Sequence, residues 1–549
     1  MRIHRRSIAL FCAMILLFTV CIWQLHYVNT SDYLAAAAEG QGHHTLNIAQ
    51  TRGGIYDRQM RLLVNNQSRL IASVLPTPEA MVELYRVLPE ERRPAVMELL
   101  RAGLPFALEL DTPQVDAPGI DVFELPERFG NLQFAPHLIG YLSDGTGIGV
   151  TGIERAFDDI LRESGGSVAA SFLVDAAGRA MPGGGVSIQR QNETHRGGVV
   201  LTLDADIQFV TQRALAEGAE RGAAVVMEIE TGNILAMASL PSFDQNNIAA
   251  SLNSLDAPFI NRAMSGHSIG SVFKGVISAG AIESGFSSSY TFNCAGYINI
   301  GGQIFRCNNY AVHGLVDMSR AMQVSCNTYF INLGLQLDPA FLLTLTTHLT
   351  GMGTSTQLAP GMFAHPGNLP TLAELQNPAA LANFSFGQGS SLATPLQLTR
   401  MMSVFAGGGR SVTPRLVEGI TENGITLSSS FPQFADTLVI SPATAAALYQ
   451  IMVDVVELGS GWPATPIYGG AGGKTSSAQT GQWVEDEDGE LSEVIHAWFS
   501  GFYPAVNPRY SITVFVEGGH SGEQVAAPIF ATIADGIYII QNSNPQRFQ

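Results

Sequence analysis

The sequence contains only two lysines, Lys274 and Lys474, among 29 lysine and arginine residues, and both stand in segments that could do chemistry. Lys274 closes an S-x-x-K motif that begins at Ser271, and Lys474 begins a K-T-S run after two glycines. Arginine stays protonated in proteins, whereas a lysine can lose its charge and accept a proton. The two lysines are therefore the candidates for an amine base.

Ser271 is followed by apolar residues at helical spacing, which predicts that a helix begins at this serine. Lys274 then lies on the same helical face, beneath the hydroxyl. A serine hydroxyl is a poor nucleophile until a neighbouring base takes its proton. Burial and a second cation both lower the pKa of a lysine, and Lys474 can supply that second charge. A solvated lysine on a helix is the alternative interpretation of this motif.

A second candidate is the S-x-N sequence formed by Ser325 and Asn327, which stands among apolar residues. The Ser325 hydroxyl can transfer a proton, and the Asn327 side chain can hydrogen-bond a substrate amide. The alternative is an ordinary turn between two helices.

The third candidate is a glycine- and serine-rich strand that begins at Gly472. Its small side chains leave room for an extended peptide beside the strand. Lys474 and Thr475 can hold a carboxylate, and the backbone N–H groups of Ser271 and Ser477 can point at a developing oxyanion. The alternative is a flexible surface segment.

These groups must be positioned by the region that begins near residue 197. It has strand patterns near both of its ends and helical patterns between them. Asp204 can cap the helix that opens this region, and 271–400 is mostly helical. This arrangement predicts an α+β domain with a single antiparallel sheet assembled from both ends. The expected strands are 223–229, 234–240, 472–479, 496–503 and 510–517.

The N-terminus predicts a membrane anchor, because residues 7–25 carry no formal charge and are long enough to span a bilayer as a helix. Arg2, Arg5 and Arg6 precede this stretch, so the N-terminus should be cytoplasmic and the rest of the chain outside. The alternative is a signal peptide cleaved near Ala35–Ala38, although the apolar run is longer than a usual signal core.

The composition predicts a well-folded protein of several domains, with 46% hydrophobic and 14% charged residues over 549 positions. We expect an anchor over 1–28, a non-catalytic domain over 29–196 and a catalytic domain over 197–549. A net charge of -18 without a basic patch argues against nucleic acid as a partner.

The cysteines suggest no metal centre by their spacing. Cys294 and Cys307 flank a polar loop, and they are equally compatible with a disulfide outside the cell and with two reduced thiols.

Taken in order, S-x-x-K, S-x-N and K-T-(G) resemble the signature of penicillin-binding proteins and serine β-lactamases. The R-G-G-I-Y-D-R sequence at 52–58 resembles a conserved box of class B penicillin-binding proteins. Further segments similar to the class B transpeptidase domain stand at 201–208, 230–237, 386–397 and 496–502. The chain departs from the signature at Ser476, where the family has glycine. A side chain there would crowd the substrate or shift the oxyanion geometry, unless it faces away.

The resemblance implies a penicillin-binding α+β transpeptidase domain, preceded by an elongated α+β pedestal and a transmembrane helix. It also implies a D,D-transpeptidase that cross-links peptidoglycan through an acyl-enzyme. Ser271 would attack the carbonyl between two terminal D-Ala residues, Lys274 would take its proton, and Ser325 would protonate the leaving D-Ala.

The remaining family positions imply substrate binding. Lys474 and Thr475 would hold the donor carboxylate, and Asn327 and Ser477 would position the amide. The implied partners are peptidoglycan stem peptides, β-lactams, the membrane and a SEDS-family glycan polymerase, and no metal or organic cofactor is implied. Before residue 196 nothing resembles a glycosyltransferase domain, so the sequence is similar to class B rather than to bifunctional class A.

Three rival functions stay open at this point. The first is a hydrolase on the same fold, either a D,D-carboxypeptidase or a β-lactamase, although the sequence shows no clear water-activating group. The second is a catalytically weak penicillin-binding scaffold, with Ser476 as the sign of lost activity. The third is a β-lactam sensor, a class in which further membrane spans or a cytoplasmic effector are expected.

Overall fold

The computed structural model describes residues 2–30, 42–175, 177, 179, 181, 186–192, 196–432, 436–485 and 491–543. The chain divides into two compact units, and both are discontinuous in sequence. The first unit comprises 1–52, 65–128 and 164–195, and the second comprises 53–64, 129–163 and 196–549. The alternative cleavage region, Ala35–Ala38, lies outside the described residues.

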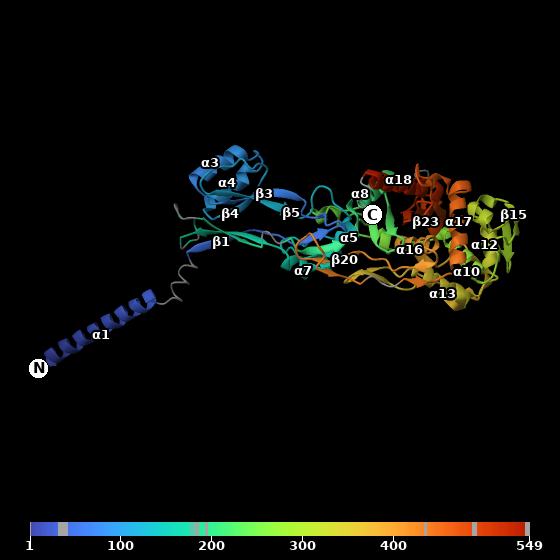
Figure 1. The fold of residues 1–549 in the computed structure, drawn as a ribbon. Helices are drawn as coiled ribbons and strands as arrows, with labels where there is room; N and C mark the ends of the chain where they lie inside the picture. Colours follow the sequence, from blue (N-terminus) through green and yellow to red (C-terminus); the bar gives the residue numbers. More distant parts are fainter. Residues whose placement is uncertain are drawn as a thin grey trace. The chain divides into compact units, whose positions relative to one another are not determined.

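The chain begins with helix α1, Arg2–Thr30, drawn in dark blue in Figure 1. Its segment Arg6–Val28 is apolar, long enough to cross a membrane, and buried nowhere against the rest of the protein. A second segment of sufficient length, Gly522–Ser543, is partly buried instead. It includes α18, Ala527–Ser543, whose Phe530 side chain lies in the core of the second unit. Of the two segments, α1 is therefore the candidate anchor.

Besides α1, the described residues of the first unit form two three-stranded antiparallel sheets and two helices, α3 and α4. Helix α3 begins at a Thr77 cap with proline in its first turn, and α4 ends at Gly103 in the left-handed conformation. The sheets have the orders β1-β6-β7 and β4-β3-β5. The bounds are β1 His43–Gln50, β3 Gln67–Val74, α3 Pro78–Val87, α4 Arg93–Ala102, β4 Phe106–Leu110, β5 Ile120–Glu127, β6 Ser167–Leu173 and β7 Val186–Gln191.

The second unit is built around a five-stranded antiparallel sheet of order β10-β9-β25-β24-β23. Strands from both ends of the unit meet in it, which confirms the predicted α+β sheet (Figure 1). Strand β23 lies at one edge and pairs with β24 along its length. The bounds are β9 Gly222–Glu228, β10 Ile234–Leu240, β23 Gly472–Glu485, β24 Leu491–Tyr503 and β25 Tyr510–Val516.

Helices cover both faces of this sheet. Helices α8, Ala205–Gly218, and α18 pack on one face, and α16, Pro395–Ala406, and α17, Pro442–Leu458, lie on the other. Asp204 caps α8 by accepting hydrogen bonds from two backbone N–H groups, as predicted. Completely buried apolar residues on both faces hold the layers together, and each contributes about 1.5–3 kcal/mol.

Segment 53–64 belongs to the second unit because its backbone and one buried carboxylate bind there. Strand β2, Gly54–Tyr56, pairs in parallel with β8, Gly198–Leu201. Asp57 is completely buried and accepts hydrogen bonds from Arg61 and from the backbone of Ala205, at the start of α8. The R-G-G-I-Y-D-R segment at 52–58 thus stabilises the second unit through Asp57, which binds the start of α8.

The remaining helices of the second unit carry the polar motifs or support them. They are α5 Pro136–Ile139, α6 Gly152–Ala156, α7 Asp158–Glu163, α9 Ile248–Ser251, α10 Lys274–Glu283, α11 Met318–Gln323, α12 Asn327–Gly334, α13 Pro339–Thr350, α14 Leu372–Leu375 and α15 Pro378–Phe384. The remaining strands are short: β11 His267–Ser268, β12 Phe292–Cys294, β13 Tyr297–Ile300, β14 Gln303–Arg306, β15 Gly314–Val316, β16 Thr356–Ala359, β17 Met362–Ala364, β18 Leu392–Ala393, β19 Arg410–Ser411, β20 Val417–Thr421, β21 Ser429–Ser430 and β22 Thr437–Leu438.

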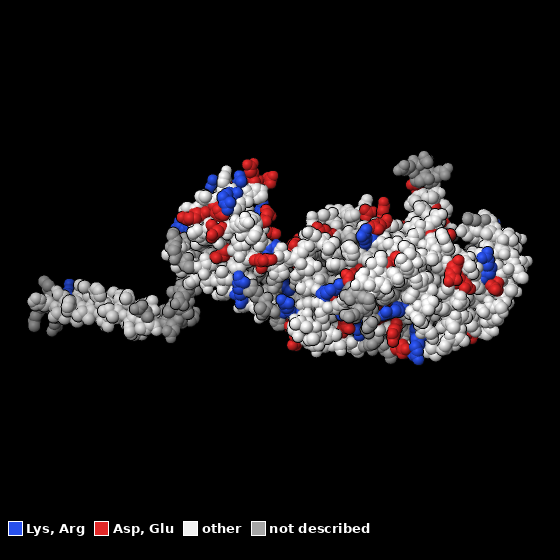
Figure 2. All heavy atoms as spheres, turned by 45° about the horizontal axis from the view of Figure 1, so that its top comes forward, with Lys and Arg blue, Asp and Glu red and all other residues white. Residues whose placement is uncertain are grey.

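Acidic and basic side chains are interspersed in small groups on the face drawn in Figure 2, with broad uncharged areas between them. This distribution agrees with the low charged content of the sequence and its excess of acidic residues.

Candidate active site

Ser271 lies in a single 3-10 turn, Gly270–Phe273, that leads directly into α10. Gly270 has a φ of 63° and donates its N–H to the Gly387 carbonyl at 2.9 Å. A Cβ atom on Gly387 would clash with the Gly270 carbonyl, so the two segments approach closely because both residues are glycine. Phe273 is completely buried behind the turn. The nucleophile candidate therefore has a rigid support.

Ser325 connects Ser271 to Lys274. The Ser325 hydroxyl donates to Ser271 Oγ at 3.0 Å, and Lys274 Nζ donates to Ser325 Oγ at 3.0 Å. Lys274 Nζ also donates to the Ser325 carbonyl at 2.8 Å and to Asn327 Oδ1 at 2.7 Å. Among the described residues no hydrogen bond joins Lys274 directly to Ser271. The sequence predicted the amine beneath the nucleophile, and the structure places a serine between them.

The S-x-N sequence is the turn between α11 and α12, which was the alternative considered from sequence. Ser325 has a φ of 54°, in the left-handed region that a non-glycine residue rarely adopts. Such backbone strain persists where the surrounding structure holds it, often at functional sites. Asn327 begins α12, and its Nδ2 donates to the Arg306 carbonyl at 3.0 Å. The turn thus presents Ser325 to both Ser271 and Lys274.

Both lysines are completely buried, and burial is the main cause of their pKa shifts. Burial lowers the pKa of Lys274 to about 7. Burial, and then the charge of Lys274, lower the pKa of Lys474 well below its usual value. Repulsion between the two ammonium groups disfavours the state in which both are charged. The expected role of Lys474 as the second cation that lowers the pKa of Lys274 stays a prediction. Lys274 can still be neutral near pH 7.

Strand β23 brings Lys474, Thr475 and Ser477 to the edge of the sheet. Lys474 Nζ donates to the Thr475 carbonyl at 3.0 Å and to Thr475 Oγ1 at 3.2 Å. Ser477 is exposed, and its hydroxyl accepts the Gly522 N–H at 3.2 Å. The hydroxyl of Ser460 lies 2.9 Å from Thr475 Oγ1. Sequence reasoning missed Ser460, which follows α17 and carries no motif of its own.

Ser476 directs its side chain toward the nucleophile turn. It is 2% exposed. Its hydroxyl accepts the Ser271 N–H at 2.7 Å and donates to the Ile269 carbonyl at 2.9 Å. The side chain therefore contacts the backbone of the nucleophile. This contact joins β23 to the Ser271 turn, so the predicted catalytic and binding residues form one site.

A buried cluster of metal-ligating side chains lies beside this site. The donor atoms of Cys294, Cys307, His313 and Cys326 all lie within 4.8 Å of one another. The Sγ atoms of Cys294 and Cys307 are 3.7 Å apart, those of Cys307 and Cys326 are 3.8 Å apart, and Cys294 Sγ lies 3.4 Å from His313 Nδ1. Tetrahedral zinc bonds of about 2.3 Å to sulfur and about 2.0 Å to nitrogen separate ligand atoms by about 3.5–3.8 Å. The donor set and its spacing thus fit zinc.

The cysteines of this cluster are free thiols. A disulfide between Cys294 and Cys307 would need an S–S distance near 2.05 Å, so that alternative is not formed. The hydrogen bond between Cys307 and Cys326 lowers the pKa of Cys307 and raises the pKa of Cys326, so it favours the thiolate that metals bind at Cys307 alone. The cluster was not predicted from sequence, because its four donors come from separate positions and no motif links them.

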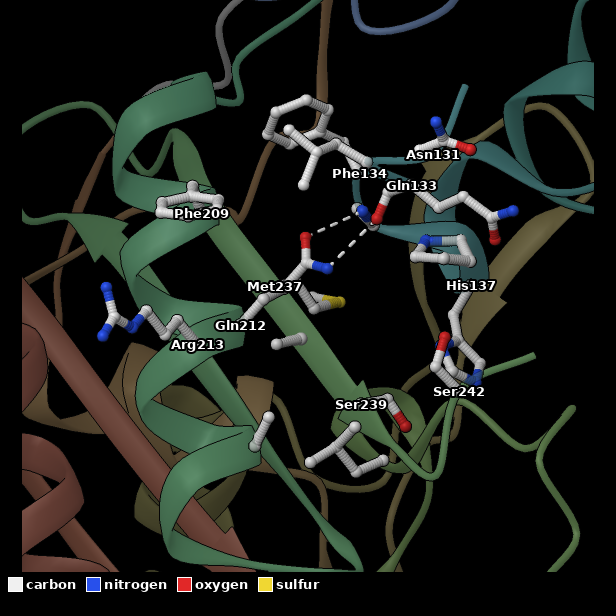
Figure 3. Close-up of a pocket in the computed structure, with 16 residues that line it drawn as sticks. Asn131, Gln133, Phe134, His137, Phe209, Gln212, Arg213, Met237, Ser239 and Ser242 are labelled. Atoms are coloured by element: carbon white, nitrogen blue, oxygen red, sulfur yellow. Dashed lines mark hydrogen bonds between the residues drawn. The ribbon is translucent and has the colours of Figure 1, made fainter. Parts of the chain in front are cut away.

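A separate cavity of about 290 Å³ lies between α8, β10 and the segment before α5 (Figure 3). Gln212 closes one wall by accepting the Ala135 N–H at 3.0 Å and donating to the Gln133 carbonyl at 3.2 Å. His137 Nε2 lies 2.7 Å from the Pro258 carbonyl oxygen, and burial lowers the pKa of His137 to about 4. These polar groups bind the protein itself, and none of the predicted catalytic residues lines the cavity.

Comparison with known proteins gives one family and many relatives. A family model described as penicillin binding protein transpeptidase domain matches residues 222–535. The peptidoglycan D,D-transpeptidase MrdA of Acinetobacter baumannii is 26% identical, over 98% of this chain and 88% of the relative. The peptidoglycan D,D-transpeptidase PbpA of Mycolicibacterium smegmatis is 29% identical, over 71% of this chain and 80% of the relative.

Solved structures share the fold. A chain from a structure titled "Structural coordination of polymerization and crosslinking by a peptidoglycan synthase complex" has a TM-score of 0.67 and 25% identity, and covers 96% of this chain and 98% of its own. Penicillin-binding protein A of Mycobacterium tuberculosis, solved as an imipenem acyl-enzyme complex, has a TM-score of 0.64 and 23% identity, over 89% of this chain and 98% of its own.

Proposed function

This chain belongs to the penicillin-binding protein transpeptidase family, and we propose that it is a class B peptidoglycan D,D-transpeptidase that acts through an acyl-enzyme on Ser271. One observation carries the assignment of residues: Ser271, Ser325 and Lys274 form a continuous hydrogen-bonded series in which the terminal amine is completely buried. Such an amine can be neutral near pH 7 and can receive the proton of the serine.

Acylation follows from this geometry. When Lys274 is neutral, its lone pair can accept from the Ser325 hydroxyl, and the two hydroxyls turn so that Ser271 donates to Ser325 and Ser325 donates to Lys274. Ser271 Oγ then bonds to the carbonyl carbon of the penultimate D-Ala, and its proton passes through Ser325 to Lys274. The carbonyl electron pair moves onto oxygen, where the N–H groups of Ser271 and Ser477 are the proposed donors. When the carbonyl re-forms, the C–N bond to the terminal D-Ala breaks. The proton returns through Ser325 to the nitrogen of the departing D-Ala.

Transfer to the acceptor reverses these steps with a different amine. The amine nitrogen of a neighbouring stem peptide attacks the ester carbon and gives its proton to the same relay. The C–O bond to Ser271 breaks, and Ser271 recovers a proton from Ser325. One peptide bond replaces another, so no oxidant or cofactor enters the balance.

The edge of β23 is the proposed binding site for the donor peptide. An extended peptide can add beside an edge strand, and the small residues of β23 leave space for it. Thr475 and Lys474 would receive the terminal carboxylate, whose negative charge favours the protonated form of Lys474. Asn327 and Ser477 would position the scissile amide. β-Lactams present a carbonyl and a carboxylate to the same groups and would acylate Ser271.

We also propose that Cys294, Cys307, His313 and Cys326 hold a structural zinc ion. Four protein ligands leave no open position for water, which is typical of structural rather than catalytic zinc. Cys326 is the residue between Ser325 and Asn327. A metal bound there would hold this strained turn in place.

The chain is proposed to be a single-pass protein with a cytoplasmic N-terminus, because α1 is apolar and three arginines stand at its start. Residues 29–196 would then form a non-catalytic domain outside the membrane and 197–549 the catalytic domain. A relative of similar fold comes from a peptidoglycan synthase complex, which supports a SEDS-family polymerase as partner.

The test of the proposed function has two parts. Purified full-length chain in detergent should be labelled by fluorescent penicillin, and Ser271→Ala should not be labelled. With a stem pentapeptide and an acceptor amine, the wild type should form the cross-linked product. Release of D-Ala that is independent of the amine would instead establish the carboxypeptidase alternative. Failure of the wild type to label would favour the scaffold.

A further inference from the structure

Ser476 holds the backbone N–H of the nucleophile in the free protein. The Ser271 N–H points at Ser476 Oγ, and their separation of 2.7 Å is at the short end for an N–H···O hydrogen bond. The same hydroxyl donates to the Ile269 carbonyl at 2.9 Å. The hydroxyl therefore accepts from one backbone group of the nucleophile turn and donates to another, which holds the side chain in one orientation.

The space for this hydroxyl comes from Gly270. A Cβ atom on Gly270 would clash with Ser476 Oγ, and Gly270 also has a φ of 63°. Ser476 itself is 2% exposed, so water does not compete for these hydrogen bonds. The arrangement is thus a buried contact between β23 and the turn that carries Ser271.

We propose that Ser476 competes with the reacting carbonyl for the Ser271 N–H and so slows acylation. The inference rests on the acyl transfer proposed above. An amide N–H directs its hydrogen at one good acceptor, and the oxyanion needs the Ser271 N–H at the moment when negative charge develops. The carbonyl oxygen of the substrate must therefore replace Ser476 Oγ, and the Ser476 hydroxyl must turn away. Acylation starts with one of its two proposed oxyanion donors already engaged.

The consequence is confined to the steps in which an oxyanion forms. Binding of the substrate carboxylate near Thr475 involves neither Ser476 Oγ nor the Ser271 N–H. Ser476 should therefore lower the first-order rate of acylation and leave the initial binding of the β-lactam unchanged. The later transfer step also passes through an oxyanion, so it should be slowed by the same contact. A purely structural residue would not slow the reaction in this selective way.

The experiment compares three variants with the full-length wild type: Ser476→Gly, Ser476→Ala and the control Ser511→Ala. Ser511 is completely buried in β25 of the same sheet, and its hydroxyl donates to the Met227 carbonyl. The acylation rate by fluorescent penicillin is measured against penicillin concentration. Both Ser476 variants should acylate on the order of fivefold to tenfold faster, which is the factor expected from removing one competing hydrogen bond. Ser511→Ala should match the wild type.

Each other outcome overturns the proposal. Equal or slower acylation in both Ser476 variants would show that the hydroxyl supports the nucleophile turn rather than competing with the substrate. Acceleration in Ser476→Gly alone would assign the effect to crowding by the Cβ atom. If the variants react faster only because they bind penicillin more tightly at first, competition for the oxyanion donor would be excluded as the cause. If the wild type is not acylated at all, the acyl-transfer proposal fails, and this inference fails with it.

Discussion

The proton of the Ser271 hydroxyl has a defined route at the scale of single residues. Ser325 lies between Ser271 and Lys274, with hydrogen bonds of 3.0 Å on each side. Burial lowers the pKa of Lys274 to about 7, so a neutral amine is available at the end of the route. Of the lysine and arginine positions in the chain, only 274 and 474 are lysine. A lysine at 274 fits the requirement for a side chain that can lose its charge, which arginine cannot do.

Replacing Lys274 by arginine should nearly abolish acylation although the positive charge is kept. Arginine cannot accept the proton from Ser325, so the loss should be about 10²-fold to 10⁴-fold. The measurement is the rate of fluorescent penicillin labelling. The control is Arg410→Lys, an exposed position where an exchange of the two basic residues should leave the rate unchanged. Robust labelling of Lys274→Arg would contradict the role of Lys274 as base.

The pH dependence of acylation should follow the protonation of Lys274. The reaction needs the neutral amine, which predominates above a pKa of about 7. The rate should therefore increase as the pH rises through 7 and reach a plateau above it. Acylation rates measured from about pH 5 to about pH 9 would check this. A rate that is constant or decreases over the range would exclude a neutral Lys274 as the proton acceptor.

At the scale of elements, three segments far apart in sequence converge on the site. The 3-10 turn supplies Ser271, the turn between α11 and α12 supplies Ser325, and β23 supplies Thr475. The first is fixed by contact with Gly387 and the last by pairing with β24. The turn at Ser325 has strained backbone, and Cys326 within it reaches the cysteine and histidine cluster. The cluster is positioned to stabilise the least regular of the three segments.

Loss of the proposed zinc should therefore affect both stability and acylation. The purified wild type should contain about one zinc ion per chain, and His313→Ala clearly less, measured by elemental analysis. Because bound metal stabilises the folded state, chelation should lower the melting temperature by roughly 5 °C or more and slow penicillin labelling. The control is His348→Ala, an exposed histidine in the last turn of α13. If the purified wild type contains no zinc, or if chelation changes neither its melting temperature nor its labelling rate, the proposed metal site is rejected.

At the scale of the whole molecule, the chain joins an apolar helix to two compact units. The unit that contains the site also includes segments 53–64 and 129–163, which precede the predicted boundary near residue 197. Asp57 binds the backbone at the start of α8, so the early box stabilises the sheet domain directly. An anchor would keep the catalytic unit close to a substrate that is outside the cytoplasm, which is the arrangement proposed for this protein.

The full-length chain should stay in the membrane pellet after an alkaline carbonate wash, because an apolar helix of this length remains in the bilayer. A chain that lacks residues 2–30 should move to the soluble fraction. Protease added outside spheroplasts should digest the catalytic domain. N-terminal sequencing of the full-length product should begin at residue 1 or 2. A product that begins after Ala35–Ala38 would instead establish a cleaved signal peptide.

The sequence alone determined the elements and the order of the motifs. The alternation of strands and helices predicted the α+β sheet, and Asp204 predicted a helix start that the structure has. Local patterns of this kind are reliable because caps and periodicity depend on neighbours in sequence. The three motifs also identified the seven candidate residues, which the fold gathers into one site. Their roles stay predictions until the variants are measured.

Only the tertiary structure decided which atoms meet. It placed Ser325 between Ser271 and Lys274, turned the Ser476 hydroxyl toward the nucleophile, and gathered a Cys₃His cluster whose spacing in sequence is uninformative. It also buried both lysines completely, and this burial is the main cause of their lowered pKa values. Such contacts join positions up to about two hundred residues apart, and hydrogen bonds and burial depend on distances in space that no local pattern encodes.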